Sequence, residues 1–253
     1  MLVIVAGCPE GWVHAGETHT VLPCPDPTPE AIQALAAGYR GSRDLLLVCA
    51  ERLLPQLQEQ AAMLVERTGL RPAFWAPSTN LVTVLGALRD LDALPGDSGL
   101  AYAHLRAVVA GSHSVSWSPR VNGLTSPAPS VGQHLRSWLP GAGFLVDWSQ
   151  GCVRPAGQGG TPTVAGPVLV EGAQDGRSAL AGVLGAPSES CPVPVPDRDP
   201  LQPELPRCAQ GAALPAAAPE VTVVARCPVC GTSLTEYECP FCHVRVASAR
   251  SER

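Results

Sequence analysis

The sequence predicts an α/β fold that contains a mostly parallel sheet with flanking helices, a proline-rich linker and a small C-terminal β-ribbon. Three observations lead to this expectation. Short apolar runs alternate with helical patterns in the first part of the chain. Nine prolines occur among residues 186–219. Two Cys-x-x-Cys pairs then lie within residues 227–242.

Three apolar runs are typical of buried parallel strands. They span residues 2–7, 44–51 and 71–77. A helical pattern follows each run, over 28–39, over 53–69 and after Ser78. Thr28 is suited to cap the first of these helices, and Gly69 is suited to end the second. We expect the proline-containing stretch between the first run and Thr28 to be a loop.

The remaining elements are predicted with weaker patterns. A helix is expected over 99–111, with strands over 113–119, 143–148 and 163–172. The α/β domain is therefore placed at residues 1–155, or extended to about 185. Residues 186–219 are expected to form a mobile, extended linker. The β-ribbon is placed at residues 220–247, with a tail at 248–253.

The cysteine spacing in the ribbon is typical of a metal site. Cys227, Cys230, Cys239 and Cys242 follow the pattern C-x2-C-x8-C-x2-C. A tight turn directs both sulfur atoms of a pair toward one ion, and a hairpin brings the second pair over the first. Gly231 follows the first pair and permits a left-handed backbone conformation, while His243 holds the equivalent place after the second.

Residues 221–246 resemble the zinc-ribbon family, which is built from two CPxCG-type knuckles on a β-hairpin. "CPVCG" matches the knuckle fully, and "CPFCH" differs in its last residue. The resemblance implies that the four cysteines are structural zinc ligands. The family is functionally broad, so the resemblance supplies no biochemical activity.

Two other chemistries fit parts of this motif. "CPFCH" also matches the attachment signature of a c-type haem, and a Cys-x-x-Cys pair can act as a redox dithiol. We favour zinc because haem would leave the pair Cys227 and Cys230 unexplained. The segment also offers only Tyr237 and Phe241 as aromatic cover for a haem. His243 is then a turn residue.

Composition excludes several functions. All the basic side chains are arginines, as in proteins from GC-rich genomes, so lysine Schiff-base chemistry and a P-loop are ruled out. The net charge of −5 and the absence of a basic stripe argue against nucleic-acid binding. We find no basic leader and no apolar run of about 18 residues, so we expect a cytoplasmic protein with no membrane interaction.

A second site is conceivable near the predicted sheet. Cys8, His14, His19 and Cys24 offer metal ligands, and Glu10 and Glu17 offer general bases. In addition, Cys8, Glu10, Cys49 and Glu51 follow the first two strands, where open parallel sheets bind ligands. The competing interpretation, which we favour, is an exposed loop with scattered polar residues and buried thiols.

Two residue types have simpler explanations. His113 lies among serines, but without a nucleophile elbow we interpret it as an ordinary strand histidine. The five tryptophans are expected to pack in the core or at its edge, because they follow no stacking pattern. They are Trp12, Trp75, Trp117, Trp138 and Trp148.

No catalytic constellation emerges, so the sequence favours an interaction or regulatory protein. A protein partner is expected to bind the ribbon through Leu234, Tyr237 and Phe241. The alternative is an enzyme with a site at the strand ends around Cys8, Glu10, Cys49 and Glu51. The sequence leaves the oligomeric state open.

Overall fold

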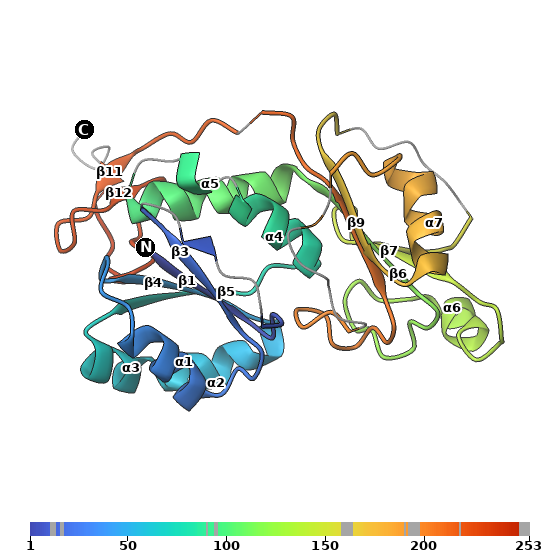
Figure 1. The fold of residues 1–253 in the computed structure, drawn as a ribbon, viewed down its shortest axis with the longest axis horizontal. Helices are drawn as coiled ribbons and strands as arrows, with labels where there is room; N and C mark the ends of the chain where they lie inside the picture. Colours follow the sequence, from blue (N-terminus) through green and yellow to red (C-terminus); the bar gives the residue numbers. More distant parts are fainter. Residues whose placement is uncertain are drawn as a thin grey trace. The chain divides into compact units, whose positions relative to one another are not determined.

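The computed structural model describes residues 1–10, 14–15, 18–89, 91–93, 96–157, 164–189, 191, 198–217 and 219–247. The chain divides into two compact units (Figure 1). The first unit combines residues 1–76, 89–107 and 219–253, and the second combines 77–88 and 108–218. The predicted domain boundaries differ from these units. Residues 77–88, predicted within the N-terminal domain, belong to the second unit, and the ribbon belongs to the same unit as residue 1.

The first unit contains a four-stranded parallel sheet extended by one short antiparallel strand. Its strands, in spatial order, are β2 (His14–Ala15), β3 (Thr20–Cys24), β1 (Leu2–Ala6), β4 (Asp44–Val48) and β5 (Arg71–Trp75). Strands β3, β1, β4 and β5 run parallel, and β2 pairs with β3 antiparallel. The three predicted strands are thus confirmed. The loop expected before Thr28 is wrong for residues 20–24, which form β3.

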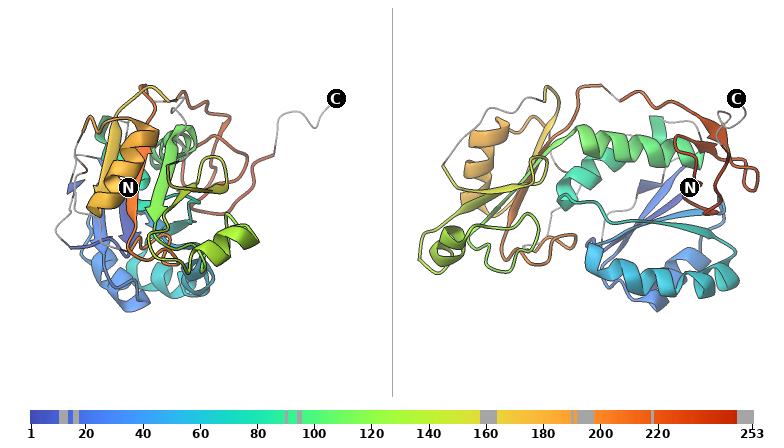
Figure 2. Two further views of the ribbon diagram at one scale, coloured as in Figure 1. Left: turned by 90° about the vertical axis from the view of Figure 1, so that its right-hand side faces the viewer. Right: turned by 180° about the vertical axis from the view of Figure 1, so that it is seen from behind.

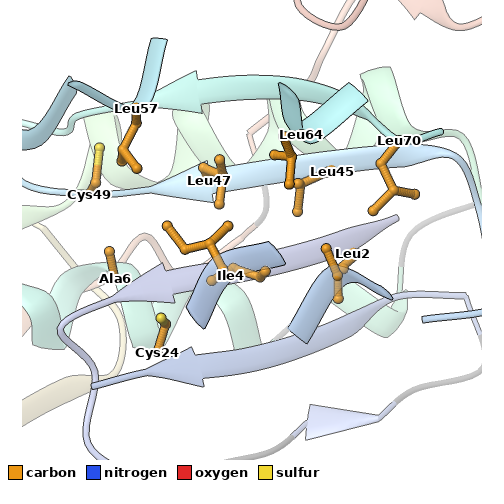
Figure 3. Packing of buried hydrophobic residues seen from close by; sticks show 12 residues of the cluster. Leu2, Ile4, Ala6, Cys24, Leu45, Leu47, Cys49, Leu57, Leu64 and Leu70 are labelled. Atoms are coloured by element: carbon orange, nitrogen blue, oxygen red, sulfur yellow. The ribbon is translucent and has the colours of Figure 1, made fainter. Parts of the chain in front are cut away.

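Four helical segments cover one face of this sheet. They are α1 (Pro29–Ala37), η1 (Glu51–Leu53), α2 (Leu54–Glu59) and α3 (Ala61–Thr68). Thr28 caps α1 as expected, since its hydroxyl accepts a hydrogen bond from the Ala31 amide at 3.2 Å. Figure 3 shows the apolar core on this face of the sheet, where alternate residues of β1 and β4 lie in one cluster with Leu57 of α2 and Leu64 of α3.

The opposite face of the sheet is occupied by helix α5 (Ser98–Gly111), which follows the short η2 (Leu91–Ala93) (Figures 1 and 2). Residues 98–107 of α5 belong to the first unit. The side chain of Tyr102 in α5 contacts Trp75 at the end of β5 edge-to-face, with 6.5 Å between the ring centroids.

The second unit is a five-stranded antiparallel sheet. Its strands, in spatial order, are β8 (Cys152–Pro155), β7 (Phe144–Asp147), β6 (His113–Ser118), β10 (Ala209–Ala213) and β9 (Val168–Gly172). Helix α7 (Gln174–Leu184) packs on one face, against β6, β9 and β10. Helix α4 (Leu81–Arg89) contributes Val82 to an apolar cluster with Leu169 and Ala212. The short helix α6 (Val131–Arg136) precedes β7. Strands β6, β7 and β9 confirm the strands predicted over 113–119, 143–148 and 163–172, whereas β8, β10 and the antiparallel order of the sheet were not predicted.

The linker prediction for residues 186–219 is wrong for residues 199–214. Strand β10 is fully buried and lies between β6 and β9. Leu201, Leu205 and Cys208, which precede it, are buried as well. Proline content misled the prediction, because buried coil also tolerates proline. Residues 190, 192–197 and 218 of this segment lie outside the described residues.

Three buried side chains cap the first turn of α4. Asn80 Oδ1 accepts from the Thr83 amide at 3.0 Å, and Gln210 Oε1 accepts from the Val82 amide at 3.3 Å. Asp199 Oδ2 accepts from the Leu81 amide at 3.2 Å. The backbone amides of the first turn of α4 therefore donate to protein side chains rather than to water. Two of these side chains, Asp199 and Gln210, are more than 100 positions away in sequence. None of the helices in the described residues is long and apolar enough to cross a bilayer.

Candidate metal centre

The two Cys-x-x-Cys turns repeat one another with an offset of twelve residues. The Gly231 amide donates to the Cys227 carbonyl at 2.9 Å, and the His243 amide donates to the Cys239 carbonyl at the same distance. Gly231 has φ 75° and His243 has φ 54°, so both adopt the expected left-handed conformation. Strands β11 (Ala225–Arg226) and β12 (Ser233–Leu234) pair antiparallel around the first turn.

The four sulfur atoms converge on one point. Those of Cys227, Cys230, Cys239 and Cys242 all lie within 4.8 Å of one another. The Cys230 and Cys239 sulfurs are 3.6 Å apart, which is too long for a disulfide. A tetrahedral ion with Zn–S bonds of about 2.3 Å separates its sulfurs by roughly 3.8 Å. The cluster therefore fits a metal ion such as zinc, in a zinc-ribbon-like site.

The thiols do not ionise independently. Burial alone would raise the pKa of Cys230, but hydrogen bonds from Thr232 and the neighbouring thiols lower it to about 7. Burial raises the pKa of Cys239 to about 11, and burial together with the nearby thiolates raises that of Cys242 further. A divalent cation would relieve this mutual repulsion and allow all four to bind as thiolates.

An arginine of the parallel sheet adds positive charge near the cluster. Burial alone would lower the pKa of the Arg71 guanidinium, but the Asp44 carboxylate and the thiolates of Cys230 and Cys242 raise it. Arg71 begins β5 and forms an ion pair with Asp44 at 2.6 Å. A zinc ion with four thiolates carries a net charge of −2, so this guanidinium favours the loaded site.

The ribbon is anchored to the N-terminal end of α5. Asp97 Oδ2 accepts from the Ser233 amide at 3.1 Å and from the Ser233 hydroxyl at 2.8 Å. Its Oδ1 also accepts from the Gly99 amide at 2.9 Å. A Cβ at Gly99 would come within 2.0 Å of the Ser233 carbonyl oxygen, so only glycine permits this approach.

Side chains further along α5 extend the contact with the ribbon. Arg106 forms an ion pair with Glu236 at 3.0 Å. Tyr102 meets Phe241 edge-to-face, with ring centroids 6.4 Å apart. Phe241 and Leu234 are only 3% and 2% exposed, so their predicted role as partner contacts is wrong. Tyr237, the third predicted contact, is 46% exposed.

His243 lines a hollow of about 300 Å³ beside the cluster. Tyr102 and Arg106 of α5 form one side of this hollow, and Glu236 and Glu238 of the ribbon lie on the other. The group of sulfur ligands does not include the His243 ring, in keeping with its interpretation as a turn residue.

The other predicted metal group does not assemble within the described residues. His19 precedes β3 and Cys24 ends it, so a strand of roughly 16 Å at about 3.3 Å per residue separates them. Cys8 lies at the Cys24 end, where the Gly7 amide donates to the Cys24 carbonyl. Burial and the nearby Asp26 raise the pKa of Cys24 to about 11. The His14 side chain and Glu17 lie outside the described residues.

The strand-end site of the enzyme alternative gains no support. Cys49 is fully buried and belongs to the apolar core shown in Figure 3, where burial raises its pKa to about 11. Cys8 is fully buried as well, whereas Glu10 and Glu51 are exposed. A buried thiol with a high pKa is a poor nucleophile and a poor ligand.

Sequence reasoning missed a buried charge cluster in the second unit. His113 Nε2 and Arg154 Nη2 each lie 3.0 Å from Asp147 Oδ2, and the Gln150 amide donates to Asp147 Oδ1 at 3.0 Å. Burial alone would raise the pKa of Asp147, but these partners lower it. These contacts link β6, β7 and β8, and no serine hydroxyl in the described part of the chain bonds to His113. Its partners are distant in sequence, and only the isolated His113 signalled it.

Neither the protein-family models nor the curated proteins that were searched contain a match to this chain.

Proposed function

We propose that this protein is a zinc-ribbon-containing interaction or regulatory protein whose ribbon binds a protein partner. The observation that carries the proposal is the set of apolar side chains that the ribbon leaves exposed. Val223, Val224, Val229 and Tyr237 are 44%, 43%, 66% and 46% exposed, although neighbouring apolar residues of the ribbon are buried. Exposed apolar and aromatic side chains on a rigid element favour docking.

The role of zinc in this proposal is structural. Four thiolates from Cys227, Cys230, Cys239 and Cys242 would complete its coordination and leave no position for a substrate. The metal would hold both turns, and the Asp97 and Arg106 contacts would hold the ribbon on α5. A surface that is already ordered loses little conformational entropy when it binds.

The experiment compares partners captured by the full chain and by the variant Val229→Ser, Tyr237→Ser. We expect the variant to lose at least one partner at unchanged zinc content, because neither residue is a ligand. Met63→Ser serves as the control, since Met63 is 49% exposed on α3, away from the ribbon. Identical partner lists from the full chain and the double variant would contradict the proposal.

A further inference from the structure

Helix α6 and the turn that follows it carry the most exposed apolar side chains among the described residues of the second unit. Val131 and Leu135 of α6 are 77% and 67% exposed, and Trp138 and Leu139 of the following turn are 69% and 63% exposed. The inner side is fixed, because Gln133 Nε2 donates to the Val153 carbonyl of β8 at 2.6 Å. The expectation that Trp138 packs in the core or at its edge is wrong, because its side chain is mostly exposed.

Three arginines converge on a hollow in the same unit. Arg120, Arg198 and Arg207 line it together with two prolines, and its volume is about 670 Å³. All three arginines are exposed, and none forms an ion pair within the part of the chain that the structure describes. Arg207 has φ 47°, an uncommon conformation for a residue other than glycine. Three exposed guanidinium groups that line one hollow favour an anionic ligand.

The helix and the arginines lie at one end of the antiparallel sheet. Ser118, the last residue of β6, pairs with Phe144, which begins β7, and Trp117 pairs with Ala209, which begins β10. Segments 119–143 and 198–208 therefore leave the sheet at the same end, as Figures 1 and 2 show.

Two hydrogen-bonded contacts fix these segments to one another. The Val121 amide donates to Ser137 Oγ at 3.1 Å, which ties the residue after Arg120 to the end of α6. Ser118 Oγ contacts the carbonyls of Arg120 and Pro206 at 2.7 and 3.1 Å, which ties the loop of Arg120 to that of Arg207. The apolar side chains and the arginine hollow therefore lie together at one end of the second unit.

We propose that this end of the second unit docks on an anionic phospholipid bilayer, with the apolar residues of α6 and its following turn in the interface and a lipid phosphate in the arginine hollow. Tryptophan and leucine beside arginines match the boundary between acyl chains and anionic headgroups. A second copy of the chain fits less well, because a two-fold dimer would bring identical arginines to the same interface. A small anion alone also fits less well, because it would leave the apolar side chains exposed. The inference is independent of the proposed role of the ribbon.

Cosedimentation of the full chain with vesicles tests the inference. The chain binds vesicles of phosphatidylcholine mixed with phosphatidylglycerol, and binds poorly to phosphatidylcholine alone. Arg120→Ala with Arg198→Ala weakens binding by about fivefold for each arginine removed. Arg40→Ala with Arg43→Ala, which changes exposed arginines of the first unit, leaves binding within about twofold. Glycerol phosphate added in solution does not prevent the chain from sedimenting with the vesicles.

The apolar side chains have their own variants and readout. Leu135→Ser with Leu139→Ser lowers binding at least about tenfold, whereas Met63→Ser does not. Vesicles shift tryptophan emission to the blue in the full chain, and Trp138→Phe removes the shift. Equal binding to neutral and anionic vesicles, or no binding to either, would overturn the proposal. Burial of Trp138 by concentration-dependent dimerisation without lipid would overturn the proposal too. So would an acidic peptide that binds the chain and displaces it from the vesicles.

Discussion

At the scale of single residues, the carboxyl group of Asp199 makes the stability of the second unit depend on pH. It is fully buried, and burial raises its pKa from 3.8 to about 7, against the opposing effect of the Leu201 and Leu81 amides. Between about pH 4 and pH 7, the folded state keeps a proton that the unfolded chain has already released. The stabilisation is therefore complete below about pH 4 and decreases until about pH 7.

The variant Asp199→Asn isolates this effect. Its amide cannot titrate, although its single oxygen can still accept from the Leu81 or the Leu201 amide. Between about pH 5 and pH 8 we expect the free energy of unfolding to fall more in the full chain than in the variant, by at most about 3 kcal/mol. Urea unfolding at both pH values measures the two changes. Equal changes in both proteins would show that Asp199 is not the titrating group.

The sulfur of Cys239 tests the metal site at the same scale. Cys239→Ser replaces a soft thiolate by a hydroxyl, and small metal modules derive much of their folding free energy from the ion. We expect faster amide hydrogen exchange throughout residues 225–246 and loss of zinc to a weak chelator. Cys152→Ser is the matched control, because Cys152 is half-buried in β8 and outside the cluster. Unchanged exchange in Cys239→Ser would contradict the structural role of the metal.

At the scale of elements, the position of the ribbon on α5 depends on the close approach at Gly99. Gly99→Ala introduces a Cβ only 2.0 Å from the Ser233 carbonyl oxygen, so the ribbon must move away from α5. We expect weakened contacts of Asp97 and Arg106 with the ribbon and faster proteolysis after Arg226. Limited trypsin digestion, followed by mass spectrometry, measures this effect.

Gly182→Ala provides the comparison for Gly99→Ala. Gly182 lies inside α7, and a Cβ there meets nothing within 4 Å. Alanine should therefore raise stability by up to about 1 kcal/mol. Equal trypsin sensitivity of the two variants would show that Gly99 does not control how the ribbon packs.

Local patterns predicted those elements that carry a strong signal within a short window of sequence. Apolar runs identified β1, β4 and β5, and the cap Thr28 identified the start of α1. Strand β3 was missed because Pro23 interrupts it, and β10 was missed because alanine and glycine dominate it. Strand β10 forms because it pairs with β6 and β9, which are distant in sequence. No short window of sequence contains this effect.

The candidate metal centre shows the same division. The ligands were predictable because two-residue spacings fix the geometry of each turn, and Gly231 and His243 adopt the expected conformation. The anchoring of the ribbon was not predictable, since Asp97 and Ser233 are 136 positions apart. The prediction that Leu234 and Phe241 contact a partner was wrong for the same reason. The sequence did not reveal that the ribbon packs on α5.

At the scale of the whole molecule, β10 makes residues 199–214, which were predicted as linker, part of the second unit. A chain that stops at residue 185 lacks the strand between β6 and β9, so its antiparallel sheet is split. A chain that stops at residue 219 keeps β10 and loses only the ribbon. We expect calorimetry to show cooperative melting of the second unit in the longer truncation and its loss in the shorter one. Similar melting of both would contradict the topology.

We infer that one metal ion holds the two turns of the ribbon together in the intact chain. Metal analysis of the purified protein, combined with X-ray absorption spectroscopy at the zinc edge, tests this claim most directly. The structure predicts about one zinc per chain, with four sulfur neighbours at about 2.3 Å and no nitrogen from His243. Iron, a haem absorption band or a zinc shell with fewer than four sulfurs would contradict it.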